Sequence, residues 1–519
     1  MQETTSEAVQ RHMLLPRAAL VGLLSGIVAV AFRWALESSE TLRHALLLWA
    51  SRASAWTWGV PVLASAVGAG MAVFLVHRVA PMGAGSGIPH VKAVLYRLRS
   101  MLWPSLLTVK FVGGTLAIGS GLALGREGPT IQMGGAVGAA VAQWLRVTPR
   151  ERQTLMAAGA GAGLAAAFNA PLSGVPFVLE ELQQPFAPTI FSAAFIAALV
   201  ADVVARSFTS QLPVFHVELT LTPPLLALPV FLVLGMLAGV LGVLYNRTLL
   251  GTMECLSRIR RWSPGVTGAL VGAVVGMVGL LVPEALGGGH SLVEDVLSGH
   301  MVLWSIPGWF LLRFVLTMLS YGCGAPGGIF APLLVLGALL GLAVGQVAQF
   351  WLPDIVTHPE AFAVIGMAAY FTAIVRAPLT GVVLIVEMTN SYAQILPLLV
   401  ACFSAYAVAD FLRDLPIYEA MLDRDLRRGG AVPTDVEPLM LEFTVHEGAP
   451  FDGKKVRELG LPHGCLLVTI HRGRYDTVPM ADTRLESGDR LRIVVAPAAA
   501  EAVMLRRQGC AAPHPHGIA

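Results

Sequence analysis

One carboxylate lies in a glycine-rich stretch of an otherwise apolar sequence, Gly121-Leu-Ala-Leu-Gly-Arg-Glu-Gly-Pro129. Residues 130–144 have the small and apolar composition of a helix, which places Pro129 near the first helical position, where its missing N–H costs nothing. Glu127 then falls at a helix start, where unpaired N–H groups and the helix dipole favour an anion or the glutamate's own carboxylate. Because burying an ionisable residue at bilayer depth is costly, the spacing predicts a site where an anion and Glu127 compete. The alternative is a glutamate in a surface loop.

Two further glycine-proline stretches have the same character, Gly85-Ser-Gly-Ile-Pro89 and Gly327-Gly-Ile-Phe-Ala-Pro332. Each can end an extended segment and open a helix, because glycine allows close backbone approach and the following turn presents N–H donors. An anion held in this way meets partial positive charges, which permits binding weak enough for release. The motif glycines and prolines are Gly85, Gly87, Pro89, Gly125, Gly128, Pro129, Gly327, Gly328 and Pro332.

The composition places these motifs in a membrane protein. Of 519 residues, 55% are hydrophobic and 13% charged, and the mean hydropathy is +0.68, which is too apolar for a soluble globule of this size. The net charge of +2 gives no indication of nucleic-acid binding. Five cysteines without paired spacing argue against metal clusters and a disulfide framework, so no metal and no cofactor are expected. With 54 glycines and 33 prolines, many helices should be broken or closely packed.

The amino terminus is expected to be cytoplasmic. Residues 1–10 are polar and predicted to be disordered within a cytoplasmic segment 1–16, and an apolar run follows at 18–32. Ala29-Val-Ala31 mimics a signal-peptide cleavage site, but the apolar pattern continues beyond it, which favours a retained first helix. Further hydrophobic stretches follow at about 58–79, 106–124, 157–179, 188–204, 225–249, 266–282, 307–321, 333–351, 361–375 and 378–411.

The chain contains an internal repeat. Lys110-Phe-Val aligns with Arg313-Phe-Val at an offset of 203 residues. Without gaps, six glycine or proline positions then coincide, from Gly119 and Gly322 to Gly138 and Gly341. After a shift of four, Ala170-Pro-Leu-Ser-Gly-Val175 aligns with Ala377-Pro-Leu-Thr-Gly-Val382, and Glu180 with Glu387. Two related halves, about 17–205 and 225–412, are therefore predicted to enclose a central site near the bilayer midplane.

A change of composition at 428–433 ends the membrane domain and begins a soluble module. Alternating apolar residues predict a strand at 439–445, and further strands are expected at 465–470, 475–478 and 490–495. Residues 453–459 are predicted to form a short helix, and 508–519 a disordered tail. The module at 434–507 is therefore predicted to be a small α+β domain.

The three motifs and the repeat together resemble the CLC family of chloride channels and chloride/proton antiporters, over residues 17–423. The resemblance implies an all-α polytopic membrane fold, an inverted-repeat bundle of broken, tilted helices. It also implies a homodimer with a separate pore in each subunit, and a multi-pass protein of a bacterial inner membrane with both termini in the cytoplasm.

The resemblance also assigns chloride ligands. Ser86 and Tyr418 correspond to the residues whose hydroxyls coordinate the central anion, and Ile329 and Phe330 offer backbone N–H groups beside it. Without the family pattern, Ser86 would be interpreted as a helix N-cap and Tyr418 as an anchor at the membrane interface. Capping and ion contact by Ser86 are compatible.

Two glutamates take proton roles by the same resemblance. Glu127 corresponds to the gating glutamate, which occupies an anion site when ionised and swings away when protonated. Glu181 corresponds to the internal proton-transfer glutamate; the alternatives are a solvated carboxylate or one paired with an arginine. Glu180 has the repeat partner Glu387 whereas Glu181 is opposite Met388, which suggests a structural role for Glu180.

The leading interpretation is secondary active exchange of chloride against protons, in which protonation of Glu127 admits the anion. The first alternative is a passive voltage- or pH-gated chloride channel of the same fold. A cation transporter would need carbonyl or acidic ion sites instead of helix starts, and no nucleophile-base pattern or nucleotide-binding loop indicates an enzyme. Serine at position 86 suits chloride, whereas the nitrate-selective members of the family have proline there.

The terminal module resembles the TrkA carboxy-terminal (RCK-C) domain, through Glu447-Gly-Ala-Pro-Phe-Asp-Gly453, Leu459-Gly-Leu-Pro462, Leu467-Val-Thr-Ile-His-Arg472 and Leu485-Glu-Ser-Gly-Asp-Arg-Leu491. This resemblance implies a regulatory module that binds a small ligand, with a cyclic dinucleotide as one candidate. A passive dimerisation module is the alternative.

Overall fold

The computed structural model of the chain describes residues 13–52, 55–182, 188–209, 215, 223–258, 263–299, 301–427, 440–473 and 475–496. The chain divides into two compact units. The first comprises residues 1–92 and 101–421, and the second comprises residues 93–100 and 422–519. The division after residue 421 lies close to the expected end of the membrane domain at 423.

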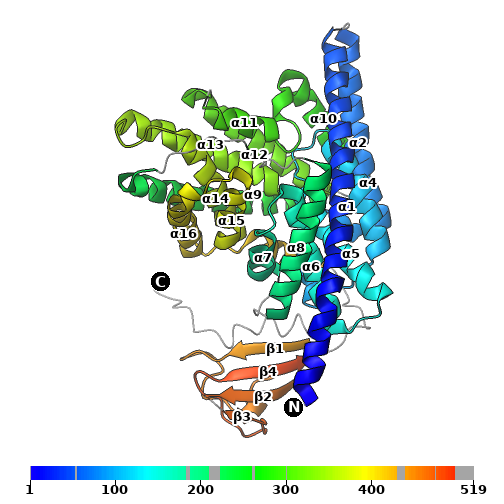
Figure 1. The fold of residues 1–519 in the computed structure, drawn as a ribbon, viewed down its shortest axis with the longest axis vertical. Helices are drawn as coiled ribbons and strands as arrows, with labels where there is room; N and C mark the ends of the chain where they lie inside the picture. Colours follow the sequence, from blue (N-terminus) through cyan, green and yellow to red (C-terminus); the bar gives the residue numbers. More distant parts are fainter. Residues whose placement is uncertain are drawn as a thin grey trace. The chain divides into compact units, whose positions relative to one another are not determined.

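The first half of the membrane unit is helical throughout (Figure 1). Its elements are α1 Gln2–Arg52, η1 Ala55–Trp58, α2 Gly59–Val79, η2 Pro81–Gly83, α3 Ile88–Leu95, α4 Trp103–Gly119, α5 Glu127–Trp144, α6 Pro149–Phe168, α7 Gly174–Phe177, the π-helical turn η3 Val178–Leu182 and α8 Pro188–Phe208. The prediction of disorder over 1–10 lies outside the described residues. Helix α1 extends well past the apolar run at 18–32. It continues unbroken through the Ala29-Val-Ala31 triplet.

The second half repeats this succession of long and short helices. Its elements are η4 Leu225–Ala227, α9 Leu228–Ile259, α10 Pro264–Leu281, η5 Pro283–Ala285, α11 His290–Leu297, η6 Leu303–Ser305, α12 Ile306–Gly322, α13 Phe330–Trp351, α14 Glu360–Val375, α15 Pro378–Thr389, η7 Tyr392–Gln394, α16 Ile395–Phe411 and α17 Ile417–Arg428. The hydrophobic stretch at 378–411 is two helices, because Asn390 ends α15 in the left-handed conformation with φ 51°. Among the described residues, eight helices are long and apolar enough to cross a membrane.

Corresponding helices of the two halves begin at corresponding residues. Helix α5 begins at Glu127 and α13 begins at Phe330, which is the offset of 203 found in the sequence. Pro129 and Pro332 are both the third helical residue, so each helix starts two residues earlier than expected from proline at the first position. The repeat therefore places the carboxylate of one half at the position of a phenylalanine in the other.

Glycines bring the backbones of paired helices into contact within each half. A Cβ atom on Gly134 of α5 would overlap the carbonyl oxygen of Gly159 on α6, and one on Gly337 of α13 would overlap that of Gly366 on α14. Such close approach compensates for the missing hydrophobic drive between helices in lipid. Helices α5 and α6 also share an alanine- and valine-rich core with α1 and α8, and α1, α6 and α8 lie side by side in Figure 1.

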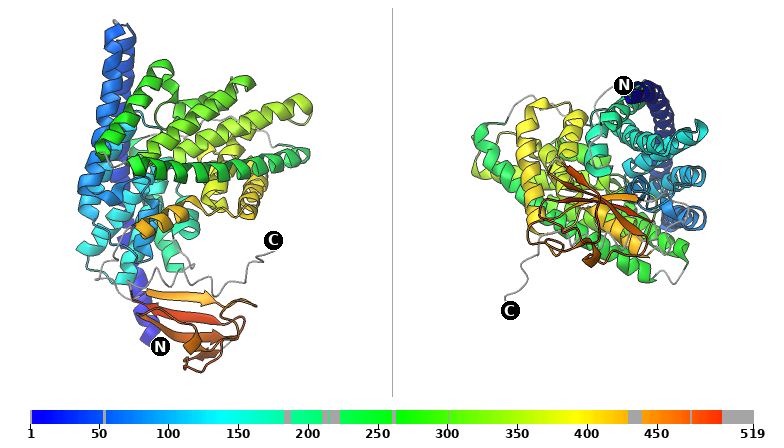
Figure 2. Two further views of the ribbon diagram at one scale, coloured as in Figure 1. Left: turned by 180° about the vertical axis from the view of Figure 1, so that it is seen from behind. Right: turned by 90° about the horizontal axis from the view of Figure 1, so that it is seen from below.

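The second unit contains a four-stranded antiparallel sheet, drawn in orange to red in Figure 2. Its strands are β1 Leu439–Thr444, β2 Cys465–Arg472, β3 Tyr475–Thr477 and β4 Arg490–Val495, in the order β1-β4-β2-β3. The four predicted strands are confirmed. The helix predicted at 453–459 is reduced to the 3-10 turn η8, Val456–Glu458. The predicted disordered tail lies outside the described residues. Together, a mostly helical membrane unit and a small sheet module agree with the predicted fold class.

Candidate anion and proton site

The three glycine-proline motifs meet through backbone hydrogen bonds. In the loop before α3, the N–H of Gly85 donates to Ala325 O at 3.2 Å, and the N–H of Gly327 donates back to Gly85 O at 3.0 Å. In the loop before α5, Gly125 and Gly328 each donate to the other's carbonyl oxygen at 2.7 Å. Motifs that are more than two hundred residues apart in sequence therefore place three helix starts at one location.

Glycine is required where these loops touch side chains of the site. A Cβ atom on Gly128 would lie 2.9 Å from the Cα and Cβ atoms of Ser86. A Cβ atom on Gly125 would overlap Oε2 of Glu127. The absence of side chains at these two positions provides the space that Ser86 and the Glu127 carboxylate occupy.

Glu127 is the first residue of α5 and is 3% exposed. Its carboxylate faces the backbone N–H of Ala331, the second residue of α13, and the guanidinium of Arg126. Within the described part of the chain, Oε2 has no hydrogen-bond partner. A carboxylate of one half thus lies at the amide end of a helix of the other half, in the kind of position that an anion would take.

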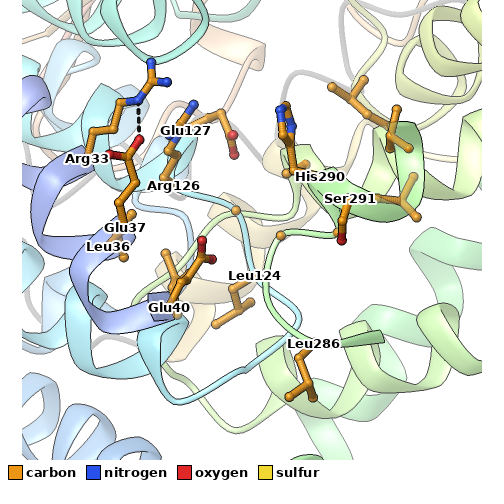
Figure 3. A pocket seen from close by; sticks show the side chains of 18 of the residues that line it. Arg33, Leu36, Glu37, Glu40, Leu124, Arg126, Glu127, Leu286, His290 and Ser291 are labelled. Atoms are coloured by element: carbon orange, nitrogen blue, oxygen red, sulfur yellow. Dashed lines mark hydrogen bonds and ion pairs between the residues drawn. The ribbon is translucent and has the colours of Figure 1, made fainter. Parts of the chain in front are cut away.

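A pocket of about 280 Å³ opens beside Glu127 (Figure 3). Arg33, Glu37 and Glu40 of α1 line one wall, and His290 of α11 lines another. His290 stacks on Phe215 with 4.9 Å between ring centroids. Loss of solvation in the pocket, followed by the positive charges of Arg126 and Arg33, lowers the pKa of His290 to about 4. The histidine is therefore a neutral part of the wall at neutral pH.

Ser86 and Tyr418 are both fully buried. Ser86 Oγ accepts a hydrogen bond from the N–H of Ile88 at 3.4 Å, and the Ser86 N–H donates to Tyr321 Oη at 3.2 Å. The capping contact inferred as one alternative for Ser86 is thus present, at a long distance. Tyr418 is the second residue of α17, and its hydroxyl has no partner within the described residues. Full burial rules out the interface-anchor alternative, and a buried phenol without a partner has unused capacity for a ligand.

Ile329 and Phe330 lie at the start of α13 and are fully buried. The first N–H groups of a helix have no acceptor within it, so both residues present donors where the motif loops meet. The Phe330 ring packs against Phe168, at 5.2 Å between centroids, and against Phe371, at 4.4 Å. These aromatic contacts fix the first turn of α13.

Glu181 differs from both alternatives raised for it. It is 4% exposed on η3, and its Oε1 atom accepts a hydrogen bond from Lys92 Nζ at 3.0 Å. It is neither solvated nor paired with an arginine. The neighbouring Glu180 instead accepts hydrogen bonds from the N–H and hydroxyl of Thr380 at the start of α15, both at 2.7 Å. The two adjacent glutamates therefore have different partners, as their unequal places in the repeat suggested.

Two buried cations, to which the sequence patterns assigned no role, bind backbone carbonyls of loops at the site: Lys110 binds the loop before α3, and Arg313 binds the loop before α11. Lys110 Nζ donates to Gly83 O at 2.9 Å and to Gly85 O at 2.6 Å. Arg313 Nη1 donates to Ala285 O at 2.7 Å and to Gly287 O at 2.9 Å. The sequence did mark Lys110 and Arg313, because these two residues begin the aligned repeat. Lys92 and Tyr321 also contact site residues, but no sequence pattern marks them.

The site contains helix-start amides, two buried carboxylates and two buried hydroxyls. The Tyr418 hydroxyl has no partner within the described residues, and the Ser86 hydroxyl accepts from the Ile88 N–H and from Tyr321 Oη at 3.4 and 3.5 Å. Such a site can hold a small anion by partial charges and can carry protons on its carboxylates. No group of three or more His, Cys, Asp or Glu side chains that could hold a metal ion occurs among the residues described above.

Known proteins share both units of the chain. Residues 68–410 match the family model described as voltage gated chloride channel, and residues 440–506 match the TrkA-C domain. The H(+)/Cl(-) exchange transporter ClcA of Vibrio parahaemolyticus is 43% identical over 420 residues, which cover 80% of this chain and 90% of the relative. The ClcA protein of Citrobacter koseri is 39% identical over 426 residues, with 80% and 90% covered.

Solved structures agree with these sequence matches. A slow cyanobacterial Cl-/H+ antiporter is 34% identical, with a TM-score of 0.77 over 80% of this chain and 99% of that one. A eukaryotic CLC transporter, 22% identical, shares the fold with a TM-score of 0.68 over 86% of this chain and 78% of that one. Both resemblances inferred from the motifs are thereby confirmed, and the chain belongs to the voltage-gated chloride channel (CLC) family, with a TrkA-C domain after its membrane unit.

Proposed function

We propose that this protein exchanges chloride for protons across a bacterial membrane, with Glu127 as the gating carboxylate and Glu181 as the internal proton-transfer carboxylate. The observation that carries the proposal is the buried Glu127 carboxylate, which lies at the amide end of α13 with one oxygen unpartnered in the described structure. A carboxylate placed there competes with any anion for the same donors.

Competition links the two ions. While Glu127 is ionised, its charge occupies the donors and excludes chloride. Protonation removes both the charge and the attraction to the amides, so the side chain can leave and chloride can enter. Chloride is then held by the hydroxyls of Ser86 and Tyr418 and by the N–H groups of Ile329 and Phe330. Because these donors carry only partial charge, chloride binds weakly enough to be released.

Glu181 is assigned as the second carboxylate, which passes protons between Glu127 and the cytoplasm. Glu181 is buried, like Glu127, and belongs to a different element. The Tyr418 phenol interacts electrostatically with both Glu181 and Glu127. The proposed chloride ligand Tyr418 is thus close enough to both glutamates to be affected by their charges.

Exchange is favoured over a passive channel by two observations. The relatives at 39% and 43% identity are named H(+)/Cl(-) exchange transporters, and the solved structure at 34% identity is a Cl-/H+ antiporter. In addition, Glu181 is a buried carboxylate in contact with a lysine, which supplies an ionisable pair that can pass protons and that passive chloride permeation does not use.

The test is coupled flux in proteoliposomes that contain the purified protein. An outward chloride gradient should drive protons inward against their own gradient, and the reversal potential should depend on the gradients of both ions. A reversal potential that follows the chloride gradient alone would assign the protein as a channel.

We infer that the protein is a homodimer with a separate pore in each subunit, in the inner membrane with both termini in the cytoplasm. Membership in the CLC family supports this inference. Crosslinking in native membranes and protease access to each terminus would test it. The TrkA-C module is proposed to bind a small regulator such as a cyclic dinucleotide, and calorimetry on the intact protein with a panel of such nucleotides would test that role.

A further inference from the structure

Lys92 lies between two carboxylates that come from different elements. Its Nζ atom donates to Glu181 Oε1 at 3.0 Å and to Glu419 Oε1 at 3.4 Å. Lys92 is 5% exposed and Glu181 is 4% exposed, whereas the Glu419 side chain is 52% exposed. One ammonium group therefore joins a buried carboxylate to a carboxylate that reaches the solvent.

The elements that carry this cluster also carry the proposed chloride ligands. Helix α3, which contains Lys92, begins two residues after Ser86, and Glu419 directly follows Tyr418 on α17. The proposed chloride ligands Ser86 and Tyr418 therefore lie on, or directly before, the elements that carry Lys92 and Glu419.

The charged groups that face Glu181 come from three elements. They are Lys92 on α3, Glu419 on α17 and the neighbouring Glu180 on η3 itself, and the Tyr418 phenol also interacts with Glu181 electrostatically. Since Glu180 is engaged with the start of α15, the exchangeable protons belong to the other members. With all three ionised, Lys92, Glu181 and Glu419 carry one net negative charge, and one added proton makes them neutral. Groups this close titrate as a unit.

We propose that Glu419, Lys92 and Glu181 form the proton-loading relay of the exchanger, an inference that rests on the proposed exchange function. Glu419 takes a proton from water at its exposed carboxylate. Lys92 donates one ammonium proton to Glu181 and accepts the proton of Glu419. The lysine is again an ammonium, Glu419 is ionised and Glu181 is protonated, so one proton has moved from water to the buried carboxylate and charge is conserved.

This relay requires a lysine and not merely a positive charge. An amine can release a proton and regain one, whereas a guanidinium stays protonated in proteins. Lys92→Arg keeps the charge and donors that would hold Glu181 in place but cannot pass a proton. The arginine variant therefore separates a relay from an electrostatic support.

The experiment measures chloride and proton fluxes in parallel in proteoliposomes that contain the wild type, Lys92→Arg, Lys92→Met, Glu419→Gln or Glu419→Asp. In both Lys92 variants and in Glu419→Gln, proton flux should fall at least about a hundredfold, the lower end of what one proton-transfer group contributes, while chloride flux stays within about twofold of wild type. Glu419→Asp should restore most of the proton flux. Glu254→Gln, an exposed carboxylate on α9 paired with Arg258, is the matched control and should leave coupling unchanged.

The outcomes separate this inference from the proposed function. A wild type without chloride-driven proton movement would refute the exchange function itself. A coupled wild type together with normal proton flux in Lys92→Arg would refute the relay and leave Lys92 as an electrostatic support. Normal proton flux in Glu419→Gln, a substitution at a half-exposed position that the fold should tolerate, would show that protons reach Glu181 by another route and would also overturn the relay.

Discussion

Glu180 and Glu387 each cap a helix of the other half of the membrane unit. Glu180 Oε2 accepts from the Thr380 N–H at 2.7 Å at the start of α15, and Glu387 Oε2 accepts from the Ser173 N–H at 2.8 Å just before α7. The two glutamates are equivalent in the repeat, and so are their partners. The approximate symmetry of the halves is therefore stabilised by a reciprocal pair of charge-assisted hydrogen bonds.

The capping role of Glu180 predicts that substitutions of the adjacent residues Glu180 and Glu181 have different effects on transport and stability. Glu181→Gln should abolish proton movement and leave chloride flux, because an amide cannot accept and release the transported proton. Glu180→Gln is the matched control. It should retain coupled exchange but lower the free energy of unfolding by about 1–2 kcal/mol, because the hydrogen bonds that Thr380 donates would go to a neutral amide oxygen instead of a carboxylate. Parallel flux measurements and thermal unfolding in detergent would check both variants.

If Glu180 rather than Glu181 transferred protons, the two variants would behave differently. Uncoupling by Glu180→Gln with unchanged stability would show that the capping carboxylate transfers protons. Unchanged exchange in Glu181→Gln would remove Glu181 from the proton path.

The sequence predicted those parts of the site that depend on local patterns. The glycine-proline motifs predicted helix starts near Glu127 and Phe330, and the repeat predicted that the motifs would meet, because equivalent elements of two halves pack about a common centre. Contacts made by single side chains across the fold leave no local signal. The position of Lys92 between Glu181 and Glu419 depends on how α3, η3 and α17 pack, and no spacing in the sequence indicates it.

Helix length was predicted less well than helix position. Helix α1 continues far beyond the carboxyl end of its apolar run, since residues 33–52 include many good helix formers that continue the hydrogen-bond ladder. The break between α15 and α16 depends on the left-handed conformation of Asn390. The sequence did not predict this break, because many asparagines within helices do not adopt that conformation.

Glu127→Gln should uncouple the two ions. Chloride should still move, because the neutral side chain no longer competes as a charge for the amides of α13, but chloride gradients should no longer drive protons. Wild-type chloride flux should rise as pH falls, because protonation of Glu127 opens the site, whereas flux in the variant should be nearly independent of pH. Flux assays across a pH series would measure both effects.

Glu40→Gln is the control for that experiment, because Glu40 lines the same pocket from α1. It should keep coupled exchange and a wild-type pH profile. Chloride-driven proton movement that persists in Glu127→Gln would contradict the assignment of Glu127 as the gate.

His290 should not contribute to the pH dependence of transport between pH 5 and 8. Its pKa is lowered to about 4 by desolvation and by Arg126 and Arg33. A histidine with a lowered pKa stays neutral above that value and gains charge only below it, so it remains neutral over the whole interval. His290→Gln should therefore leave the pH profile of chloride flux unchanged in its shape. Loss of a titration step near pH 6 to 7 in this variant would contradict the prediction.

The ion pair between Arg472 and Asp489 should be the main polar support of the TrkA-C module. Arg472 donates from Nε and Nη2 to the two oxygens of Asp489, both at 2.7 Å, and Asp489 is fully buried. The hydrogen bonds to Asp489 raise the pKa of Arg472 above its ordinary value. A base with a raised pKa contributes its full stability at every pH below its ordinary pKa. The contribution of this pair to the free energy of unfolding should therefore not change through titration of Arg472 near neutral pH.

Arg472→Gln should leave the buried Asp489 carboxylate with the Glu486 N–H as its donor among the described residues. The expected loss is about 2 kcal/mol, less than for a fully buried pair because the Arg472 side chain is 41% exposed. Hydrogen exchange of the β2 and β4 amides in the intact protein would measure it as faster exchange. Arg492→Gln is the control, because Arg492 makes an exposed contact with Glu442 at 3.8 Å and should change stability by less than about 0.5 kcal/mol. Equal protection in both variants would mean that backbone donors and packing, rather than the guanidinium, stabilise the carboxylate within the sheet module.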